Sequence, residues 1–408
     1  MKGVSCLVFL FLALVTTGVS AASYDVAAYV WPAYQPDPRW AELGIFKDGK
    51  GEWQNLYESE KRFDDDYQGV KPLWGYADES DPVEVSRKID AAVAAGVNVF
   101  VYDWYWYGGR PFLENALNKG FLGATNNERM RFFIMWANHD VNGLWNNKVG
   151  DAKEKNKVIW PARVSDADFR AIVARWIRQY FTRANYYRIG GKPVLSLYDV
   201  ESFVKWDGAE KARARIAYLR DEVKRAGLPG LHLQILVQPW WDEPMRAAVK
   251  ALAPDSMTVY NWLFSTWLRM NDDAAPPLTY RAWGEMAMRD LESAQKLADA
   301  FGVPFFPNVT VGWDTNARYP REVRKPIAHG PTPEEFERFS RRARDRADTR
   351  LPPDMPRLVT VNSWNEWTEG TYLEPDDRFG YGYLNALWRV FVKEGNTTSQ
   401  RQTKEQKK

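Results

Sequence analysis

The sequence predicts an α/β protein with one domain, a (β/α)8 TIM barrel whose loops after the strands are long. Three observations predict this fold. Short apolar runs alternate with longer amphipathic stretches over most of the chain, eight such runs occur, and polar and aromatic side chains follow them directly. The length of 408 residues suits a barrel with insertions, and no Gly/Ser-rich linker or internal repeat marks a second domain.

The eight apolar runs have the length of fully buried parallel strands, so each is predicted to be one strand of the barrel. In chain order they are residues 24–30, 97–103, 131–137, 192–198, 231–237, 256–261, 303–311 and 357–362.

Helices are predicted between the strands. The stretch from Asp81 has apolar residues three and four positions apart, acids near its start and Gly96 at its end. The same pattern occurs at 166–184, 208–226, 279–301 and 333–349, whereas the stretches after the fifth and sixth strands read partly as loop.

The first 21 residues are typical of a secretory signal peptide. Lys2 precedes an apolar run that is too short to span a bilayer well, and small residues follow it, so cleavage is expected after Ala21 or Ala22. The alternative is an uncleaved anchor. We therefore expect a secreted or periplasmic protein with a catalytic barrel at 22–393, a disordered polar tail at 394–408 and no membrane span in the mature form. The only cysteine, Cys6, lies in the leader.

The charge and the scarce residue types exclude several functions. With 55 Lys and Arg against 53 Asp and Glu, the net charge of +2 gives no reason to expect nucleic acid or an anionic membrane as partner. Three His and one Cys argue against zinc, thiol and Ser-His-Asp chemistry, so no metal or cofactor is expected. The run at Asp64, Asp65 and Asp66 is interpreted as a solvated loop, with a calcium site as the alternative.

The side chains that follow the strands indicate carbohydrate chemistry. The chain has 20 each of Trp, Tyr and Phe, and many of them occur with acids and amides where a barrel carries its active site. Rings suit the C–H faces of sugars, and acids and amides suit their hydroxyls, although each Trp alone fits core packing too. These residues are Trp31, Tyr34, Asp103, Trp104, Tyr105, Trp106, Trp136, Asn138, His139, Asp140, Asp199, Glu201, Gln238, Trp240, Asp242, Asn261, Trp262, Trp313, Asp314 and Trp364.

The last strand leads into the motif VNSWNEWTEGTYLEPD at 361–376. Glu366 and Glu369 are three positions apart and converge if the chain turns helically after the strand. Two carboxyls in one site have divergent pKa values, which makes one an acid and the other a base. The alternative is an acid-rich helix start stabilised by the helix dipole.

The segment SWNEWTEGTYLEPD closely resembles the W-N-E-W-x-E-G-x-x-L/I-E-P signature of the WbsX-like proteins and of the related glycoside hydrolase family 99. Four other segments resemble WbsX-like segments in the same order, and the resemblance covers residues 24–393. They are VKPLWGYADESDP at 70–82, FFIMWANHD at 132–140, GGKPVLSLYD at 190–199 and GWDTNAR at 312–318.

The resemblance implies a (β/α)8 barrel and, for family 99, an endo-acting α-mannosidase that retains configuration by participation of the substrate's own 2-hydroxyl. By motif position, Glu366 would be the base that acts on this hydroxyl and Glu369 the acid and base that serves the leaving oxygen and then water. Family 99 has His where this chain has Thr368, and the WbsX-like W-A-N-E segment ends here in His139. The first-strand loop also lacks the His that is usual there, so the identity of the sugar does not carry over.

The leading hypothesis is a secreted glycoside hydrolase that cleaves an oligo- or polysaccharide. One alternative is a WbsX-type glycosyltransferase of surface-polysaccharide biosynthesis, against which stand the leader and the absence of a Gly-rich phosphate loop. Another is a non-catalytic carbohydrate-binding barrel, against which stands the presence of both glutamates. Glu366 and Glu369 are the catalytic candidates, and the substrate-binding candidates are Trp31, Tyr34, Asp103, Trp104, Trp106, Trp136, Asn138, His139, Trp313, Asp314, Asn365, Trp367 and Glu374. Linkage, anomer and oligomeric state stay open.

Overall fold

The computed structural model describes residues 24–63, 69–237, 243–263, 266–270, 272 and 275–395. The predicted leader at 1–21, the acidic run Asp64–Asp66, the strand-end residues Gln238, Trp240 and Asp242, and the tail from residue 396 onward lie outside the described residues.

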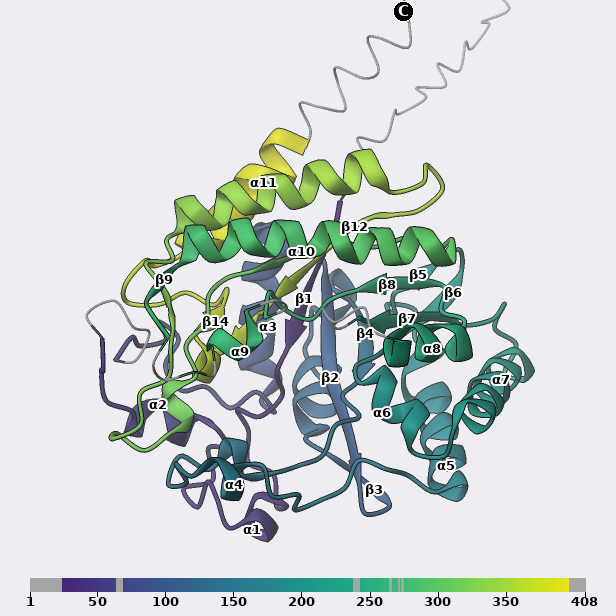
Figure 1. Cartoon of the computed structure of the whole chain (residues 1–408), viewed down its shortest axis with the longest axis horizontal. Coiled ribbons are helices and arrows are strands. Elements are labelled where there is room, and N and C mark those ends of the chain that lie inside the picture. The colour runs from purple at the N-terminus through teal and green to yellow at the C-terminus, as the bar shows by residue number, and fades with distance from the viewer. Residues whose placement is uncertain are drawn as a thin grey trace, which may run out of the picture.

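Eight parallel strands form the barrel and confirm the predicted fold (Figure 1). Seven neighbouring pairs join them in the order β10-β12-β1-β2-β4-β6-β7-β8. The ring closes between β8 and the chain before β10, where Met257 bridges Phe305 and the Phe306 N–H donates to the Met257 carbonyl at 2.8 Å. The strands are β1 (Tyr24–Val30), β2 (Val99–Tyr107), β4 (Arg131–Trp136), β6 (Lys192–Leu197), β7 (His232–Leu236), β8 (Ser256–Thr258), β10 (Asn308–Thr310) and β12 (Arg357–Asn362).

Three of the strands have an end that lies three or more residues from the predicted one. β2 continues to Tyr107 because it forms a hairpin with β3 (Arg110–Phe112) at the end of the barrel. β10 starts only after Pro307, since prolines at 304 and 307 have no N–H to give to a neighbouring strand. β8 ends at Thr258, which puts Tyr260 beyond the strand.

Helices surround the barrel, and α10 and α11 run side by side across one side of it (Figure 1). Side chains cap two of the helices: Asp81 accepts a hydrogen bond from the Val83 N–H at the start of α3, and Thr332 accepts one from the Glu335 N–H at the start of α11. The helices are α1 (Trp40–Leu43), α2 (Trp53–Glu58), α3 (Pro82–Ala94), α4 (Ala152–Lys155), α5 (Asp166–Trp176), α6 (Val200–Lys205), α7 (Ala209–Arg225), α8 (Glu243–Leu252), α9 (Trp267–Met270), α10 (Tyr280–Phe301), α11 (Pro333–Arg350) and α12 (Gly382–Leu387).

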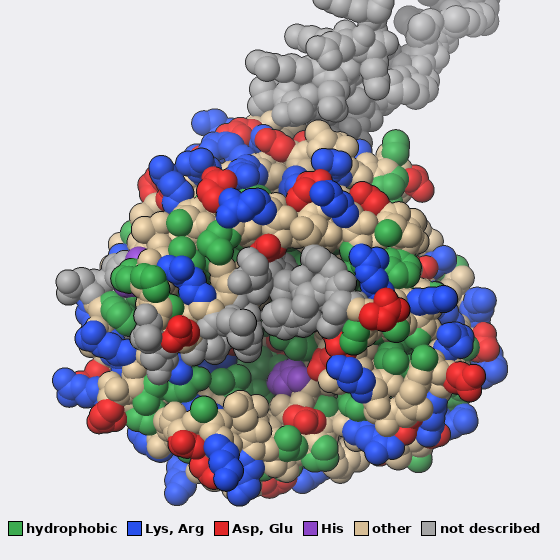
Figure 2. All heavy atoms as spheres, viewed as in Figure 1, with side chains coloured by type: hydrophobic (Ala, Val, Ile, Leu, Met, Phe, Trp, Pro, Cys, Tyr) green, Lys and Arg blue, Asp and Glu red, His purple; other side chains and the backbone are tan. Residues whose placement is uncertain are grey.

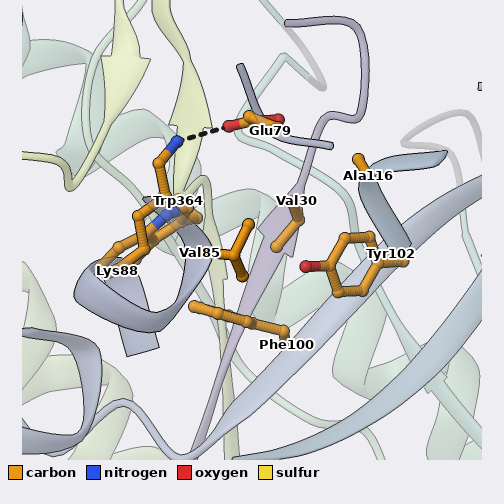
Figure 3. A pocket seen from close by; sticks show the side chains of 8 residues that line it. All are labelled: Val30, Glu79, Val85, Lys88, Phe100, Tyr102, Ala116 and Trp364. Atoms are coloured by element: carbon orange, nitrogen blue, oxygen red, sulfur yellow. Dashed lines mark hydrogen bonds and ion pairs between the residues drawn. The ribbon is translucent and has the colours of Figure 1, made fainter. Parts of the chain in front are cut away.

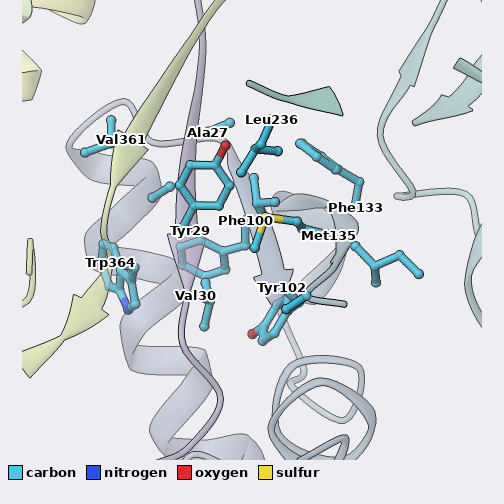
Figure 4. Packing of buried hydrophobic residues seen from close by; sticks show 14 of the residues in the cluster. Ala27, Tyr29, Val30, Phe100, Tyr102, Phe133, Met135, Leu236, Val361 and Trp364 are labelled. Carbon is cyan, nitrogen blue, oxygen red and sulfur yellow. The ribbon is translucent and has the colours of Figure 1, made fainter. Parts of the chain in front are cut away.

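Each barrel strand has one face toward the helices and one toward the barrel axis. Figure 4 shows the packing around β1 and β2, where the Phe100 ring lies 5.1 Å from the Trp364 ring. On the inner face, polar side chains of adjacent strands bond to each other: Asn308 donates to the Thr360 hydroxyl at 3.0 Å, and Thr258 lies 3.2 Å from the same hydroxyl. This polar layer lies below the carboxyl ends of the strands, where Asn362 follows Thr360 on the inner face.

The end of the described chain differs from the prediction. Glu394 was expected to start a disordered tail, but it pairs with Arg341 at 2.6 Å and with Arg344 at 2.9 Å. These two guanidinium groups fix Glu394 against α11, so it belongs to the folded domain. Within the described ranges, no helix is long and apolar enough to cross a membrane.

Candidate active site

Glu366 and Glu369 lie on a tight turn that follows β12. Asn365 and Glu366 form β13, which pairs antiparallel with β14 (Thr371–Tyr372), and residues 367–369 between them form a single 3₁₀ turn. Gly370 ends the turn with a φ of 62°, a conformation that glycine adopts without strain. The helical turn expected from the spacing of the two glutamates is therefore present.

Glu366 is buried in a polar pocket of uncharged donors. The Tyr260 hydroxyl lies 2.6 Å from its Oε1, the Asn362 amide donates to its Oε2 at 3.4 Å, and its backbone N–H donates to the Ser363 hydroxyl. Burial raises the pKa of Glu366 well above its ordinary value, and the nearby carboxylates of Glu369 and Asp103 raise it further.

Glu369 has a charged partner instead. It forms an ion pair with Arg318, a residue that is only 3% exposed. The same guanidinium donates to Glu52 at 2.7 Å and to the Thr368 hydroxyl at 3.1 Å. Glu52 is completely buried and also accepts a hydrogen bond from the Trp31 indole at 2.5 Å. Arg318 is thus held between a structural carboxylate behind the site and the carboxylate of Glu369.

Asp103, in the middle of β2, is the third carboxyl of the site. Its Oδ2 lies 3.1 Å from the Tyr260 hydroxyl, the same hydroxyl that contacts Glu366. Burial raises the pKa of Asp103 well above its ordinary value, and the charge of Glu369 raises it further. Oδ1 of Asp103 is buried and makes no hydrogen bond to any described residue.

Aromatic side chains surround these acids. The Tyr198 ring lies 5.5 Å from the Tyr260 ring, and His139 lies 5.6 Å from Tyr198 and 5.7 Å from Tyr105. The His139 Nδ1 lies 3.0 Å from the Asp140 carbonyl, and burial lowers the pKa of the imidazole, so His139 is neutral at pH 7. Figure 2 shows that the face turned to the viewer is hollowed and that hydrophobic side chains and a histidine line the hollow.

Three predicted sugar-binding tryptophans lie on the outer face of the barrel. The Trp104 indole donates to Glu114 at 2.7 Å, and its ring contacts Trp176 of α5. Trp106 stacks on Trp104, and Trp136 also packs against Trp176. The structure does not bring these rings together with the carboxylates, and their positions fit core packing.

Three predicted polar residues bond to the backbone. Asn365 donates to the Trp31 carbonyl and accepts from the Trp31 N–H, both at 2.8 Å. Asn138 makes the same pair of bonds with the backbone of Asp199, and Asp314 accepts from the Asn316 N–H. These side chains hold the loops that carry the site.

The other predicted residues lie in the wall around the acids. Tyr34 accepts from the Thr368 N–H, and Trp367 stacks on Tyr372 and donates to Glu374 at 2.8 Å. Trp313 is 5% exposed. Trp31 contacts Arg318, whose guanidinium lies 5.8 Å from its ring. Of the predicted residues, Asp103, Glu366 and Glu369 are therefore the acids of the site, Trp31 lies beside their partner Arg318, and His139 lies beside Tyr198.

Sequence reasoning missed Tyr260, Arg318 and Glu52 as members of the site. Tyr260 was placed inside the sixth strand, and only the early end of β8 puts it at the site. Arg318 closes the GWDTNAR segment, which was noted for its resemblance alone. Glu52 comes from the long loop after β1, where no local pattern marks it. Among the described residues, no cluster of three or more His, Cys, Asp or Glu is arranged to hold a metal ion.

The arrangement supplies two glutamates in contrasting surroundings, one with a phenol and the other with a guanidinium. Such a difference separates the proton affinities of two groups of the same type and lets them take opposite parts in acid–base catalysis. Tyr260 and Asn362 hold Glu366 by hydrogen bonds, and Arg318 holds Glu369 by an ion pair.

Comparison with known proteins identifies a family. The family model described as Glycosyltransferase WbsX matches residues 26–387. Two curated relatives, both called uncharacterized protein WxcX and both from Xanthomonas campestris pv. campestris, are 26% identical over 388 residues. The match covers 90% of this chain and 50% of each relative, so the chain spans about half the length of the curated relatives it matches.

Solved structures share the fold. A glycoside hydrolase-like protein matches with a TM-score of 0.59 and 15% identity, over 90% of this chain and 94% of that one. The family 99 endo-α-mannosidase from Bacteroides thetaiotaomicron matches with a TM-score of 0.53 and 15% identity, over 92% and 98% of the two chains. At these identities the similarity concerns the barrel and its loops.

Proposed function

The chain belongs to the WbsX family, and we propose that it is a glycoside hydrolase that cleaves an oligo- or polysaccharide. One observation carries this proposal: Glu366 and Glu369 occur together at the carboxyl end of the barrel, one beside a phenol and the other beside a guanidinium. Hydrolysis of a glycosidic bond uses such a pair of carboxyls. The barrel's similarity to glycoside hydrolase structures supports the same reaction class.

The motif resemblance supplies the roles in the proposed reaction. Glu366 takes the proton of the substrate's 2-hydroxyl, and the freed oxygen attacks the anomeric carbon to form an anhydro sugar. Glu369 gives a proton to the departing oxygen and then takes one from the water that attacks the anomeric carbon. As this attack breaks the bond from the anomeric carbon to the 2-oxygen, Glu366 returns its proton to that oxygen, so that both glutamates regain their starting states.

A glycosyltransferase is the second candidate, because the family's description names that activity. A transferase would use an activated sugar donor, whereas a hydrolase needs only water and a glycan. Incubating the purified protein with α-mannans, bacterial surface glycans and nucleotide sugars, followed by product analysis, separates the two. Release of smaller glycans without a nucleotide sugar supports the hydrolase, and elongation that depends on a nucleotide sugar contradicts it.

The first prediction separates the two glutamates by leaving group. Glu369→Gln is expected to lower turnover of a natural glycan by about 10²–10⁴-fold while largely sparing an activated aryl glycoside, whose leaving oxygen needs no proton. Glu366→Gln is expected to slow both substrates alike, because the 2-hydroxyl must lose its proton in either case. Steady-state kinetics with the two substrate types measures both effects.

A 2-fluoro sugar provides the control for this mechanism. It lacks the reacting hydroxyl, so the intact enzyme is not expected to turn it over. A stable mass increase on Glu366 after incubation with this sugar would instead show direct nucleophilic attack by Glu366, which contradicts participation of the 2-hydroxyl while preserving the hydrolase assignment.

As part of the proposed function we place the enzyme outside the cytoplasm, where extracellular or periplasmic glycans are accessible. The leader pattern at residues 1–21 supports this location. Amino-terminal sequencing of the protein from the periplasm or medium of a bacterial host is expected to begin at Ala22 or Ser23. A protein that retains Met1 and stays with the cytoplasm would contradict the placement.

A further inference from the structure

Tyr260 joins two carboxyl groups that lie on different strands. Its hydroxyl oxygen is 2.6 Å from Oε1 of Glu366 and 3.1 Å from Oδ2 of Asp103. A phenol has one proton, so it can donate to only one of these carboxyls at a time. The other carboxyl can hold its place beside the phenol oxygen only if it is protonated and donates a hydrogen bond itself.

The geometry decides which carboxyl receives the phenol proton. A separation of 2.6 Å is typical of a hydroxyl that donates to an ionised carboxylate, whereas 3.1 Å is typical of a weaker bond. Burial and the neighbouring carboxylates raise the pKa of Glu366, and the positive charge of Arg318 opposes this rise, whereas burial and the charge of Glu369 raise the pKa of Asp103. Asp103 is 6% exposed, and Tyr260 is its only hydrogen-bond partner among the described residues.

The unpartnered Oδ1 of Asp103 also indicates that Asp103 is the protonated carboxyl and Glu366 the ionised one. If Asp103 were ionised, both of its buried oxygens would need donors, and Oδ1 has none among the described residues. If Oδ2 carries a proton and donates it to the Tyr260 oxygen, Oδ1 is the carbonyl oxygen of a neutral acid. An unpaired neutral carbonyl costs far less than an unpaired buried charge.

We propose that Asp103, Tyr260 and Glu366 form a hydrogen-bonded chain in which one proton is shared between two carboxyls, with Asp103 protonated and Glu366 ionised at rest. Asp103 donates to the phenol oxygen, and the phenol proton points at Glu366. Asp103 is thus a positioning residue that acts through Tyr260. Its catalytic consequence, that Glu366 is ready to accept the substrate's hydroxyl proton, rests on the proposed function, but the position of the proton does not.

The shared proton balances without a further reactant. Transfer along the chain breaks the O–H bond of Asp103, forms one at Tyr260, and passes the original phenol proton to Glu366, so that the two carboxyls exchange protonation states. Other titratable groups face this chain from neighbouring elements and contribute to its charge balance. They are Glu369, Arg318, Tyr29, Tyr105, Tyr198, Asp199 and His139.

Infrared spectroscopy of the substrate-free protein tests where the proton lies and does not depend on any activity. The wild type is expected to show the C=O stretch of a protonated carboxyl at pH 7 that is absent from Asp103→Asn and shifts when aspartate alone is ¹³C-labelled. Bands from other protonated carboxyls cancel in the difference between wild type and variant. A band that is lost in Glu366→Gln but not in Asp103→Asn, or no band assignable to Asp103, would overturn the proposal.

Steady-state kinetics on a glycan that the protein cleaves tests whether Glu366 is held ready to accept the substrate's hydroxyl proton. Asparagine mimics a protonated aspartate because its amide can donate to the Tyr260 oxygen, so the acidic limb of the pH profile of kcat/KM is expected to lie at the same pH in Asp103→Asn as in the wild type, whatever the level of kcat/KM. Tyr260→Phe removes a hydrogen bond to a carboxylate, so its kcat/KM is expected to fall about 10- to 100-fold and its acidic limb to move to higher pH. An acidic limb that moves in Asp103→Asn as far as it does in Tyr260→Phe, with thermal unfolding unchanged, would overturn the assigned role of Asp103.

The infrared and kinetic experiments together show whether the shared proton or the proposed function is at fault. If no glycan is cleaved but the aspartate band behaves as expected, the shared proton stands and the hydrolase assignment fails. If cleavage is observed without the aspartate band, the hydrolase stands and the shared proton is wrong. Asp103→Ala, which can neither donate nor accept, is expected to move the acidic limb in the same direction as Tyr260→Phe but by less, because the phenol still donates to Glu366.

Discussion

Arg318 forms ion pairs with two carboxylates, Glu52 and Glu369, that come from segments far apart in the chain. Its removal is therefore expected to lower the stability of the folded protein. Glu52 is fully buried and has Arg318 as its cation, so Arg318→Met leaves a buried negative charge without compensation. Breaking a buried ion pair from one side costs about 3–5 kcal/mol, and we expect that loss in the free energy of unfolding measured with urea. It also deprives Glu369 of its ion-pair partner.

The double variant Glu52→Gln with Arg318→Met is the matched control, because it removes the buried charge together with its partner. We expect it to recover most of the stability lost in Arg318→Met. Equal stability of the wild type and Arg318→Met would show that Arg318 does not neutralise Glu52.

At the scale of single residues, the sequence predicted the acids of the site better than their partners. Glu366 and Glu369 were recognisable because their spacing and their Trp neighbours are local features of one segment. Tyr260, Arg318 and Glu52 reach the site from other loops, and no local pattern specifies that one guanidinium will lie between two carboxylates. Asn138 and Asn365 were expected to bind sugar, yet in the structure they bond to loop backbone.

At the scale of elements, one face of β2 lies toward the candidate site and the other packs against the outer core. Trp104 on the outer face donates to Glu114, whereas Tyr105 on the inner face lies beside His139 and Trp31. We expect Trp104→Phe to lower the free energy of unfolding by about 1–3 kcal/mol, since Glu114 loses a buried donor, and to leave KM nearly unchanged.

Tyr105→Phe is the matched variant on the neighbouring position. It keeps the ring and removes only the inward hydroxyl, so we expect a change in KM or kcat with little change in stability. Urea unfolding and steady-state kinetics on the same preparations measure both quantities. A rise in KM for Trp104→Phe with unchanged stability would restore Trp104 as a sugar-binding residue.

The elements themselves were predictable because a parallel barrel strand is buried on both faces and reads as a continuous apolar run. For the same reason the run does not show which side chains point inward, and three outward tryptophans were assigned to the site. The predicted strand ends were wrong where something other than the apolar pattern determines them. Prolines make β10 start later in the chain than predicted, and the hairpin with β3 lengthens β2.

At the scale of the whole molecule, a buried charge cluster behind the barrel wall ties distant segments together. Lys88 of α3 lies 2.7 Å from Glu79 (Figure 3). It also lies 2.6 Å from Glu374, which comes from the loop after β14. Asn365 also donates to Glu79 at 2.7 Å. The cluster thus connects the loop before α3, α3 itself and the segment that carries Glu366 and Glu369.

This cluster makes stability depend on pH, because two buried carboxylates share one cation. Burial raises the pKa of Glu79 from 4.5 to about 7, and the charge of Glu374 adds to this rise. Burial lowers the pKa of Lys88, but the two carboxylates raise it by more, so Lys88 stays charged over this range. Between pH 4.5 and about 7 the folded protein therefore holds a proton on Glu79 that the unfolded chain has lost.

Since the folded state binds more protons in this window, the free energy of unfolding is expected to fall as pH rises from 4.5 to about 7, by up to about 1.4 kcal/mol per pH unit for one proton. Glu79→Gln stays uncharged at every pH and leaves Lys88 with Glu374 alone, so it should remove this part of the slope. Glu84→Gln, on the exposed side of α3 beside Arg87, is the matched control and should keep the wild-type slope. Urea unfolding across the window measures the difference between the variants, and parallel slopes for wild type and Glu79→Gln would show that Glu79 is already ionised in the folded protein.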